Sequence, residues 1–167
     1  MHFELVRPLE NHREQYEEMM DEWESFGGRL NPGALRRYSY RLQRKVSYTQ
    51  WLDWIREDRE TTQDLFFFLG DGRLLGAISI RTGENVGIDG HSGYGIRPSE
   101  RGKGYATEML AMALEIMREK GINPVILSCA PDNEASARVM LHNGAVFVGD
   151  ATEKDTGETV KVYQITL

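Results

Sequence analysis

The sequence predicts a single α/β domain over residues 1–167, with a mixed, mostly antiparallel sheet of about seven strands that is flanked by helices. Three observations support this prediction. Two apolar segments meet at Asp71-Gly72, a dipeptide that is typical of a β-hairpin turn. Residues 105–120 carry apolar side chains at helical spacing. The run PVILSCA at 124–130 is short and largely apolar, as in a strand that is buried on both faces.

The N-terminal part of the chain is predicted to contain one strand and three helices. The stretch HFELVRP alternates well enough for a strand and ends at Pro8. Residues 11–26 have aromatic residues and methionines at helical spacing, and the two glycines that follow end this helix. A second helix is predicted over 34–45. Ser47 and Gln50 form a capping-box pattern, which predicts that a third helix starts there.

From the hairpin onward, strands and helices alternate. The predicted helix over 105–120 ends at Gly121, and a later helix ends at an Asn-Gly pair. The last two apolar runs are expected to pair across the turn KDTGE. In chain order, the predicted elements are strands at 64–69, 74–80 and 90–98, a helix at 105–120, a strand at 124–130, a helix at 133–144, and strands at 145–150 and 160–167.

Composition narrows the classes of protein to which the chain can belong. A net charge of −6 disfavours general electrostatic binding to nucleic acid or to an anionic membrane. Cys129 is the single cysteine, so an internal disulfide is excluded and a reducing compartment is expected. The N-terminal stretch MHFELVRPLE lacks the apolar region of a signal peptide. We therefore expect a cytoplasmic protein that binds neither nucleic acid nor membrane.

The stretch RPSERGKGYATEML, residues 97–110, places two glycines around a lysine directly before a predicted helix. A helix start offers unpaired N–H groups and the positive end of the helix dipole, so this position suits a phosphate group. A P-loop is excluded, because Gly104 stands where Ser or Thr is required and Arg97 stands at the first glycine position. A dinucleotide-binding fingerprint is disfavoured, because Thr107 stands where its third glycine is required.

Arg101, Gly104 and Ala106 match the pattern R-x-x-G-x-A, after a strand that ends in proline and before a long helix. This pattern resembles the signature of the acetyl-CoA-dependent N-acetyltransferases of the GNAT superfamily, in which loop amides hold the pyrophosphate of the cofactor. A tight turn with solvated basic residues is the alternative. The resemblance implies a single GNAT-like domain, acetyl-CoA as co-substrate without a metal, and cofactor contacts from Ile96, Arg97, Arg101, Gly102, Lys103, Gly104, Tyr105, Ala106 and Thr107.

A second motif, PDNEAS at 131–136, follows the predicted buried strand and opens the next helix. It resembles the GNAT position that contacts the pantetheine arm and the thiol end of the cofactor, which implies this role for Asn133 and Ser136. The same residues are also good N-capping residues. The resemblance extends from about Asp71 to the C-terminus, with N-terminal elements that fit it. The stretch GHSGYGIRPSERGKGYATEML is also similar to a subgroup of predicted acetyltransferases.

The resemblance implies an acyltransferase in which a primary amine attacks the carbonyl carbon of acetyl-CoA directly. A backbone N–H of the strand GYGIRP is expected to stabilise the oxyanion. His91 is our candidate general base, because a histidine titrates near neutral pH and glycines at positions 93 and 95 leave room beside it. Glu84 and Asp89 are the reserve candidates. The alternative for His91 is a surface histidine in a glycine-rich loop.

The general acid is less clearly indicated. Many family members carry a tyrosine seven residues after the motif asparagine, where this sequence has Met140. The candidate hydroxyls are those of Tyr94, Tyr105 and Tyr163, of which we choose Tyr94, and solvent is the alternative. Cys129 ends a predicted buried strand, so we expect a small core residue rather than a nucleophile.

The acceptor is expected to be a small-molecule or peptide amine, and a homodimer is one expected assembly because GNAT proteins are often dimers. The first predicted helix carries acidic residues that would favour a cationic acceptor, unless they only form a solvated face: Glu17, Glu18, Asp21, Glu22 and Glu24. Two other classes of function stay open. One is an acyl-CoA-binding sensor or a catalytically silent module. The other is a transferase that uses another acyl donor or an oxygen nucleophile.

Overall fold

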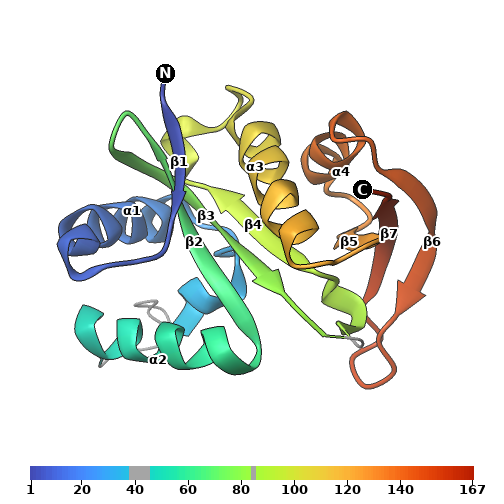
Figure 1. The fold of residues 1–167 in the computed structure, drawn as a ribbon, viewed down its shortest axis with the longest axis horizontal. Helices are drawn as coiled ribbons and strands as arrows, with labels where there is room; N and C mark the ends of the chain where they lie inside the picture. The colour runs from blue at the N-terminus through green and yellow to red at the C-terminus, as the bar shows by residue number, and fades with distance from the viewer. Residues whose placement is uncertain (38–45, 84–85) are drawn as a thin grey trace.

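The computed structural model describes residues 1–37, 46–83 and 86–167. Within these residues, helices and strands are interspersed along the chain and pack together, which confirms the predicted α/β fold class (Figure 1). The helices and strands are β1 (Phe3–Val6), α1 (Arg13–Phe26), α2 (Tyr48–Thr61), β2 (Gln63–Gly70), β3 (Arg73–Arg81), β4 (Ser92–Ile96), α3 (Tyr105–Glu119), β5 (Val125–Cys129), α4 (Glu134–His142), β6 (Val146–Thr152) and β7 (Thr159–Ile165). Short 3-10 helices are η1 (Glu10–His12), η2 (Gly33–Arg37), η4 (Gly87–Asp89) and η5 (Pro98–Glu100).

The first sheet has the strand order β1-β2-β3-β4, and all of its neighbouring strands are antiparallel. The β2–β3 hairpin turns at Asp71 and Gly72, whose φ angles of 48° and 80° are both left-handed. A two-residue turn with two left-handed residues matches the twist of the strands on either side, and glycine adopts this conformation without strain. The predicted hairpin is therefore confirmed.

The second sheet has the order β5-β7-β6 and is also antiparallel. The two sheets meet at a bridge between Gly90 and Leu127, where the N–H of His91 donates to the carbonyl of Ile126 at 2.8 Å. A side chain at Gly90 would collide with that carbonyl, so glycine permits the close approach. Beyond this contact, no strand pairing joins β4 to β5 in the described part of the chain. The predicted seven strands are present, but they form two sheets that separate after His91 rather than one continuous sheet.

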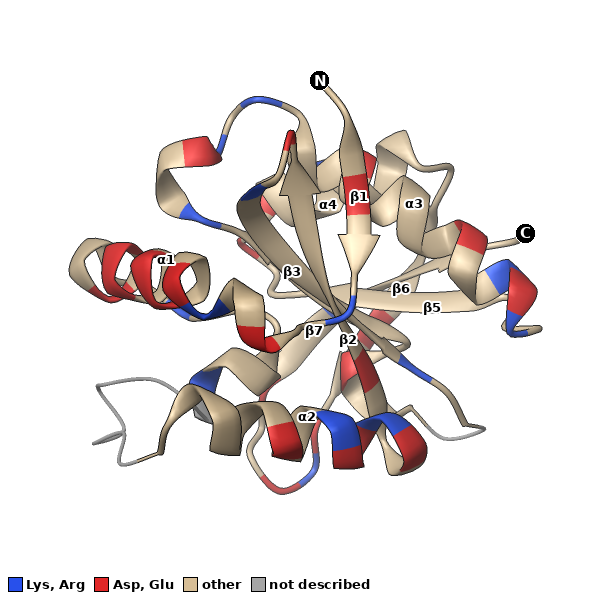
Figure 2. Ribbon diagram, turned by 60° about the vertical axis from the view of Figure 1, so that its left-hand side comes forward, with Lys and Arg blue, Asp and Glu red and all other residues tan. Residues whose placement is uncertain are grey.

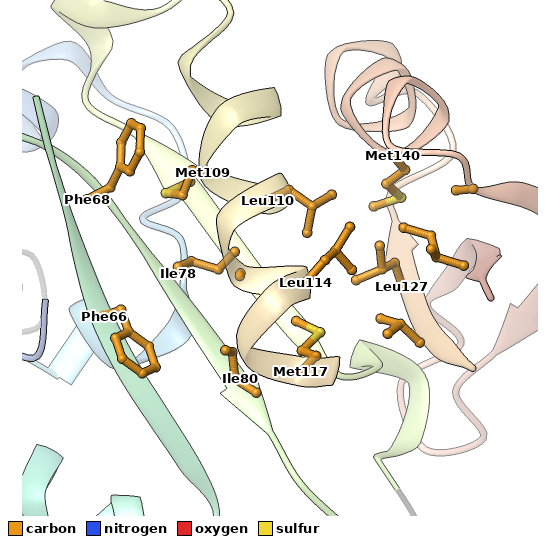
Figure 3. Close-up of a cluster of buried hydrophobic side chains, with 14 of the residues drawn as sticks. Phe66, Phe68, Ile78, Ile80, Met109, Leu110, Leu114, Met117, Leu127 and Met140 are labelled. Carbon is orange, nitrogen blue, oxygen red and sulfur yellow. The ribbon is translucent and has the colours of Figure 1, made fainter. Parts of the chain in front are cut away.

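Helices cover both faces of the first sheet, so its central strands β2 and β3 are buried on both sides. On one face, Phe66 and Ile78 belong to a cluster with Met109 and Leu110 of α3, which extends to Met140 of α4 (Figure 3). The burial of β2 shows no alternation between its two faces. Each large apolar side chain that is fully buried stabilises the fold by about 1.5–3 kcal/mol. This cluster fixes α3, and therefore the loop before it, against the sheet.

The other face of the first sheet is covered by α1, η2 and α2. Tyr16 of α1 stacks on Trp51 of α2, with ring centroids 4.4 Å apart, and on Phe67 of β2 at 5.5 Å. Both Tyr16 and Trp51 are completely buried. The helix predicted over 34–45 begins as the 3-10 helix η2, and residues 38–45 lie outside the described residues.

Two helix ends lie where the capping residues predict them. The Ser47 hydroxyl oxygen accepts a hydrogen bond from the N–H of Gln50 at 3.1 Å, which confirms the predicted N-cap of α2. Helix α3 begins directly after Gly104 and is followed by Gly121, and the φ angles of these glycines are 83° and 77°. Glycine tolerates both left-handed positions, so the chain can turn sharply into α3 and out of it.

Candidate active site

A cavity of about 610 Å³ lies beside β4, at the starts of α3 and α4. Its walls come from β4, from the loop that precedes α3, and from α4, which lie next to one another in the fold (Figure 1). The structure therefore brings the two sequence motifs to one site. Nine of the predicted cofactor residues line this cavity: Ile96, Arg101, Gly102, Gly104, Tyr105, Ala106, Thr107, Asn133 and Ser136.

The loop before α3 turns through two left-handed glycines, with φ angles of 78° at Gly102 and 83° at Gly104. A Cβ atom added at either position would meet no protein atom within 4 Å, so both glycines are open toward the cavity. Gly104 offers no side chain to cap the helix. The first N–H groups of any α-helix lack an intrahelical acceptor, and at α3 no N-cap side chain accepts from them. These amides and the helix dipole make the loop a suitable site for a phosphate group.

Arg101 is held against the cavity wall by its neighbours. Its Nε donates to the carbonyl of Ile96 at 2.9 Å, and its guanidinium lies over the rings of Trp23 and Phe26 at 5.2 and 5.3 Å. Lys103 does not line the cavity, and its ammonium pairs with the carboxylate of Glu100 at 2.8 Å. Of the two predicted basic contacts in this loop, Arg101 is thus the one that the structure places at the site.

Arg97 points away from the cavity, which differs from the cofactor contact expected from the sequence. Its side chain is 1% exposed and pairs with Glu18 at 3.0 Å and with Glu22 at 3.1 Å. The same guanidinium donates to the carbonyl of Leu74 at 3.0 Å. Because successive residues of a strand face opposite sides, Arg97 projects toward α1 rather than toward the cofactor loop. We infer a structural role that ties α1 to the end of β4.

The start of α4 and the middle of β4 meet at the cavity. The side-chain oxygen of Asn133 accepts from the N–H of Ser136 at 3.1 Å, so Asn133 does cap the helix, as its sequence context allows. The hydroxyl of Tyr94 lies 3.0 Å from that of Ser136. Burial raises the pKa of Tyr94 to about 12, so the phenol is protonated at neutral pH and can act as a donor.

The register of β4 decides which of its backbone groups face the opening. Arg97 donates its N–H to the carbonyl of Leu75 of β3 at 2.8 Å, and Gly93 donates its N–H to the hydroxyl of Ser79 of β3 at 3.3 Å. Backbone groups of alternate residues point to opposite edges of a strand. The N–H groups of the intervening even-numbered residues, including Tyr94, therefore point toward the separated β5. The donors available to an oxyanion are on this edge.

A second cavity of about 530 Å³ adjoins the first. The two cavities share five lining residues and therefore adjoin along them: Arg29, Asn31, Tyr94, Asn133 and Ser136. The lining of the second cavity contains six charged side chains from both sheets and from the segment after α1: Arg29, Arg36, Arg81, Asp89, Asp132 and Glu158. Sequence reasoning did not single out the three arginines, because they lie on separate segments that only the fold brings together.

His91 lines neither cavity. It is 9% exposed, and its Nδ1 accepts a hydrogen bond from the N–H of Ile126 at 2.9 Å. Burial lowers the pKa of this imidazole. The room expected beside it is also occupied, since a Cβ at Gly93 would lie 3.2 Å from the Arg81 guanidinium and one at Gly95 would lie 2.7 Å from Trp23. His91 as general base stays a prediction, and the geometry does not favour it.

The remaining residues that the sequence singled out fall into two groups. Met140 and Tyr163 are buried in the core and line neither cavity. Tyr105 lines the first cavity and packs on Phe3, with ring centroids 5.5 Å apart. Cys129 is a buried free thiol that belongs to the core cluster and also lines the second cavity, and burial raises its pKa, which disfavours the reactive thiolate.

Acidic residues follow one another along α1 (Figure 2). None of the five that suggested a cationic acceptor lines either cavity, and two of them, Glu18 and Glu22, pair with Arg97. Among the described residues, no group of three His, Cys, Asp or Glu side chains is arranged to hold a metal ion. Of the helices in the described ranges, none has the length and apolar character needed to cross a membrane.

The fold is that of an α/β protein with two antiparallel sheets. A glycine turn at the start of α3 lines its cavity and suits a phosphate-bearing cofactor. The family model of the acetyltransferase (GNAT) domain matches residues 5–146, so the chain belongs to the GNAT acetyltransferase family. Its family therefore makes it an acetyltransferase. The resemblance drawn from the two sequence motifs is confirmed.

Solved structures share this fold. RimJ from Mycobacterium smegmatis, in complex with CoA-disulfide, has 17% identity and a TM-score of 0.75, over 98% of this chain and 81% of that chain. The RimL ribosomal L7/L12 α-N-protein acetyltransferase, in complex with coenzyme A, has 17% identity and a TM-score of 0.72, over 99% and 94%. The microcin C7 self-immunity acetyltransferase MccE, in complex with acetyl-CoA and AMP, has 15% identity and a TM-score of 0.71, over 99% and 92%. At these identities the likeness concerns the fold alone. No curated protein sequence matches the chain.

Proposed function

We propose that this protein transfers the acetyl group of acetyl-CoA to a primary amine by direct attack of the amine on the thioester. The observation that supports this most strongly is that the two cavities adjoin, with Tyr94, Asn133 and Ser136 among the five lining residues that they share. A cofactor that fills the first cavity would bring its thioester to this boundary. An amine that enters through the second cavity would then reach the carbonyl carbon without a covalent enzyme intermediate.

The cofactor would lie along the residues that line the first cavity. Its pyrophosphate would rest against Gly102 and Gly104 and accept hydrogen bonds from the free amides at the start of α3. Arg101 supplies positive charge from the wall. The pantetheine arm would then pass between β4 and α4, beside Ile96 and Asn133, so that the thioester arrives near the Tyr94 hydroxyl.

The reaction forms a C–N bond and breaks a C–S bond. As the amine attacks, the thioester oxygen becomes an oxyanion, and the N–H groups on the open edge of β4, including that of Tyr94, are positioned to donate to it. The sulfur then leaves with the electron pair of the C–S bond as a thiolate. The Tyr94 hydroxyl can donate a hydrogen bond to this thiolate. Because the phenol has a pKa of about 12, it stabilises the thiolate more than it protonates it.

The amine must lose a proton before or during its attack. An alkylamine with a pKa of roughly 10 is mostly protonated at neutral pH, and removing the proton costs about 4 kcal/mol. Of the described candidate bases, Asp89 lines the second cavity, whereas His91 lines neither. We therefore propose Asp89 as the first residue to test for this role. Glu84, the other reserve candidate, lies outside the described residues.

The experiment that tests the function is a screen of primary amines with acetyl-CoA. Release of free thiol is measured, and each product is identified by its mass. We expect thiol release that requires an amine and a product that carries one added acetyl group. Binding of acetyl-CoA without thiol release from any amine would instead support a sensor or silent module. An ester product, or a preference for another acyl-CoA, would support the alternative transferase.

The location and assembly of the protein are also proposals. We propose the cytoplasm, because Cys129 is the single cysteine and is a buried free thiol, as expected in a reducing compartment. We propose a homodimer from the family resemblance alone. Light scattering on the purified protein would test the assembly, and a mass equal to one chain would contradict it.

A further inference from the structure

Three arginines from separate segments line the second cavity. Arg29 follows α1, Arg36 lies in η2, and Arg81 ends β3. The guanidinium of Arg36 donates to the carbonyl of Leu30 at 2.8 Å, and that of Arg81 donates to the carbonyl of Gly90 at 3.0 Å. Backbone carbonyls thus orient two of these side chains without neutralising them, and part of each guanidinium stays available to a ligand.

The cluster is short of negative charge. Within the described residues, no carboxylate forms an ion pair with Arg29, Arg36 or Arg81, whereas the buried Arg97 contacts both Glu18 and Glu22. Burial lowers the pKa of Arg36 and of Arg81. The charges of Arg29 and Arg81 lower the pKa of Arg36 further, and Asp89 is the carboxylate that opposes these effects.

Three arginines that no carboxylate neutralises are unfavourable in one cavity without an anion, because like charges repel one another and the burial of Arg36 and Arg81 adds a desolvation cost. A bound carboxylate or phosphate would relieve both effects, and the planar guanidinium matches the geometry of these anions through paired hydrogen bonds. The other acidic residues of the cavity, Asp132 and Glu158, come from the loops of the second sheet and are exposed. The cavity thus has a cationic part, formed by β3 and the segments after α1, and an acidic part on the loops of the second sheet.

We infer that the acceptor carries, besides its amine, an anionic group of the carboxylate or phosphate type that binds to Arg29, Arg36 and Arg81. This inference rests on the proposed acetyl transfer to an amine. It replaces the cationic acceptor suggested by the acidic residues of α1, none of which lines either cavity. The acidic part of the cavity would receive the amine, and the anionic group would lie on the arginine side.

The test compares acceptors in matched pairs that differ by the anionic group. One pair is an α-amino acid and its carboxamide, a second is an aminoalkyl phosphate and the corresponding amino alcohol, and diamines of similar length complete the panel. We expect kcat/KM for the anionic member of a pair to be about 10- to 100-fold higher, because hydrogen bonds between charged groups are strong. The carboxylate and phosphate pairs show which of the two anions the site prefers.

Two variants assign the preference to the cluster. Arg36→Gln should reduce the advantage of the anionic acceptor about tenfold or more, and Arg36→Lys should restore part of it, while the Kd of acetyl-CoA stays unchanged. Arg56→Gln is the matched control, because Arg56 lies on α2 and lines neither cavity. Neutral amines or diamines that react as fast as the anionic acceptors would overturn the inference and leave the proposed function intact. Failure of every amine to release thiol would instead contradict the proposed function.

Discussion

The hydroxyls of Tyr94 and Ser136 lie 3.0 Å apart and join the middle of β4 to the first turn of α4. This contact crosses the gap between the two sheets, which otherwise meet at Gly90 and Leu127. It also stands at the boundary between the two cavities. The Tyr94 side chain therefore lines both the proposed cofactor cavity and the proposed acceptor cavity.

Replacement of Tyr94 by phenylalanine should slow turnover without weakening cofactor binding. The variant removes the hydroxyl that would stabilise the leaving thiolate, and we expect kcat to fall about 10- to 100-fold. The Kd of acetyl-CoA should change less than about threefold, because the ring and its packing stay. Tyr163→Phe is the control, since Tyr163 lines neither cavity. Equal kcat values for Tyr94→Phe and the wild type would remove this hydroxyl from the mechanism.

Two glycine variants can distinguish the loss of the proposed pyrophosphate site from the effect of backbone strain. Gly104 and Gly121 have φ angles of 83° and 77°, and a Cβ at either would meet no protein atom within 4 Å. Alanine at either position should cost about 1–2 kcal/mol of stability, because both residues are left-handed. Gly104→Ala should also raise the Kd of acetyl-CoA about tenfold or more, because only Gly104 lines the cavity. Calorimetric titration of both variants measures this, and equal Kd values would exclude the proposed phosphate position.

Arg97 should contribute to stability rather than to cofactor binding. Arg97→Gln leaves Glu22 without its cationic partner and is expected to lower the free energy of unfolding by about 2–4 kcal/mol. Arg73→Gln should cost less than about 1 kcal/mol, because that side chain is 46% exposed and solvent screens its ion pairs. Urea unfolding gives both values. A folded Arg97→Gln variant with weaker acetyl-CoA binding and unchanged stability would restore the role expected from the sequence.

His91 predicts a pH dependence of stability. Burial lowers its pKa below the usual value for a histidine of about 6.5, so well above that pH the imidazole is neutral in both the folded and the unfolded state. As the pH falls, the unfolded state takes up the proton first, so the free energy of unfolding decreases until the pH passes the folded-state pKa. His91→Asn keeps an acceptor for the N–H of Ile126 but does not titrate, so this component should disappear.

The measurement is the difference in thermal unfolding between the wild type and His91→Asn from pH 7.5 to pH 5. A difference is required because burial lowers the pKa of His12 as well, which gives the same sign in both proteins. The rate of acetyl transfer serves as the second measurement. A variant that loses most activity at pH 7 and recovers it as the pH rises would support the base role predicted from the sequence.

Features that depend only on residues close together in the chain could be predicted from the sequence. The turn at Asp71-Gly72 and the caps at Ser47 and Asn133 follow from local backbone preferences, because these residues satisfy or permit the conformation at their own positions. The start of α3 after Gly104 has the same origin. The cofactor loop could be predicted because a phosphate site at a helix start is formed by the backbone amides of one short segment.

Which side chains face the site depends on contacts between segments that are far apart in the chain. Side chains alternate between the two faces of an extended segment, so the sequence left two possible orientations for Arg97. Its ion pair with Glu22 of α1 holds it on the face away from the cofactor loop. The contact of His91 with Ile126 and the gathering of Arg29, Arg36 and Arg81 join segments that are far apart in the chain. Such contacts depend on how helices and sheets pack. The burial and pairing of a charged side chain depend on residues that are distant in the sequence, so a local pattern cannot predict them.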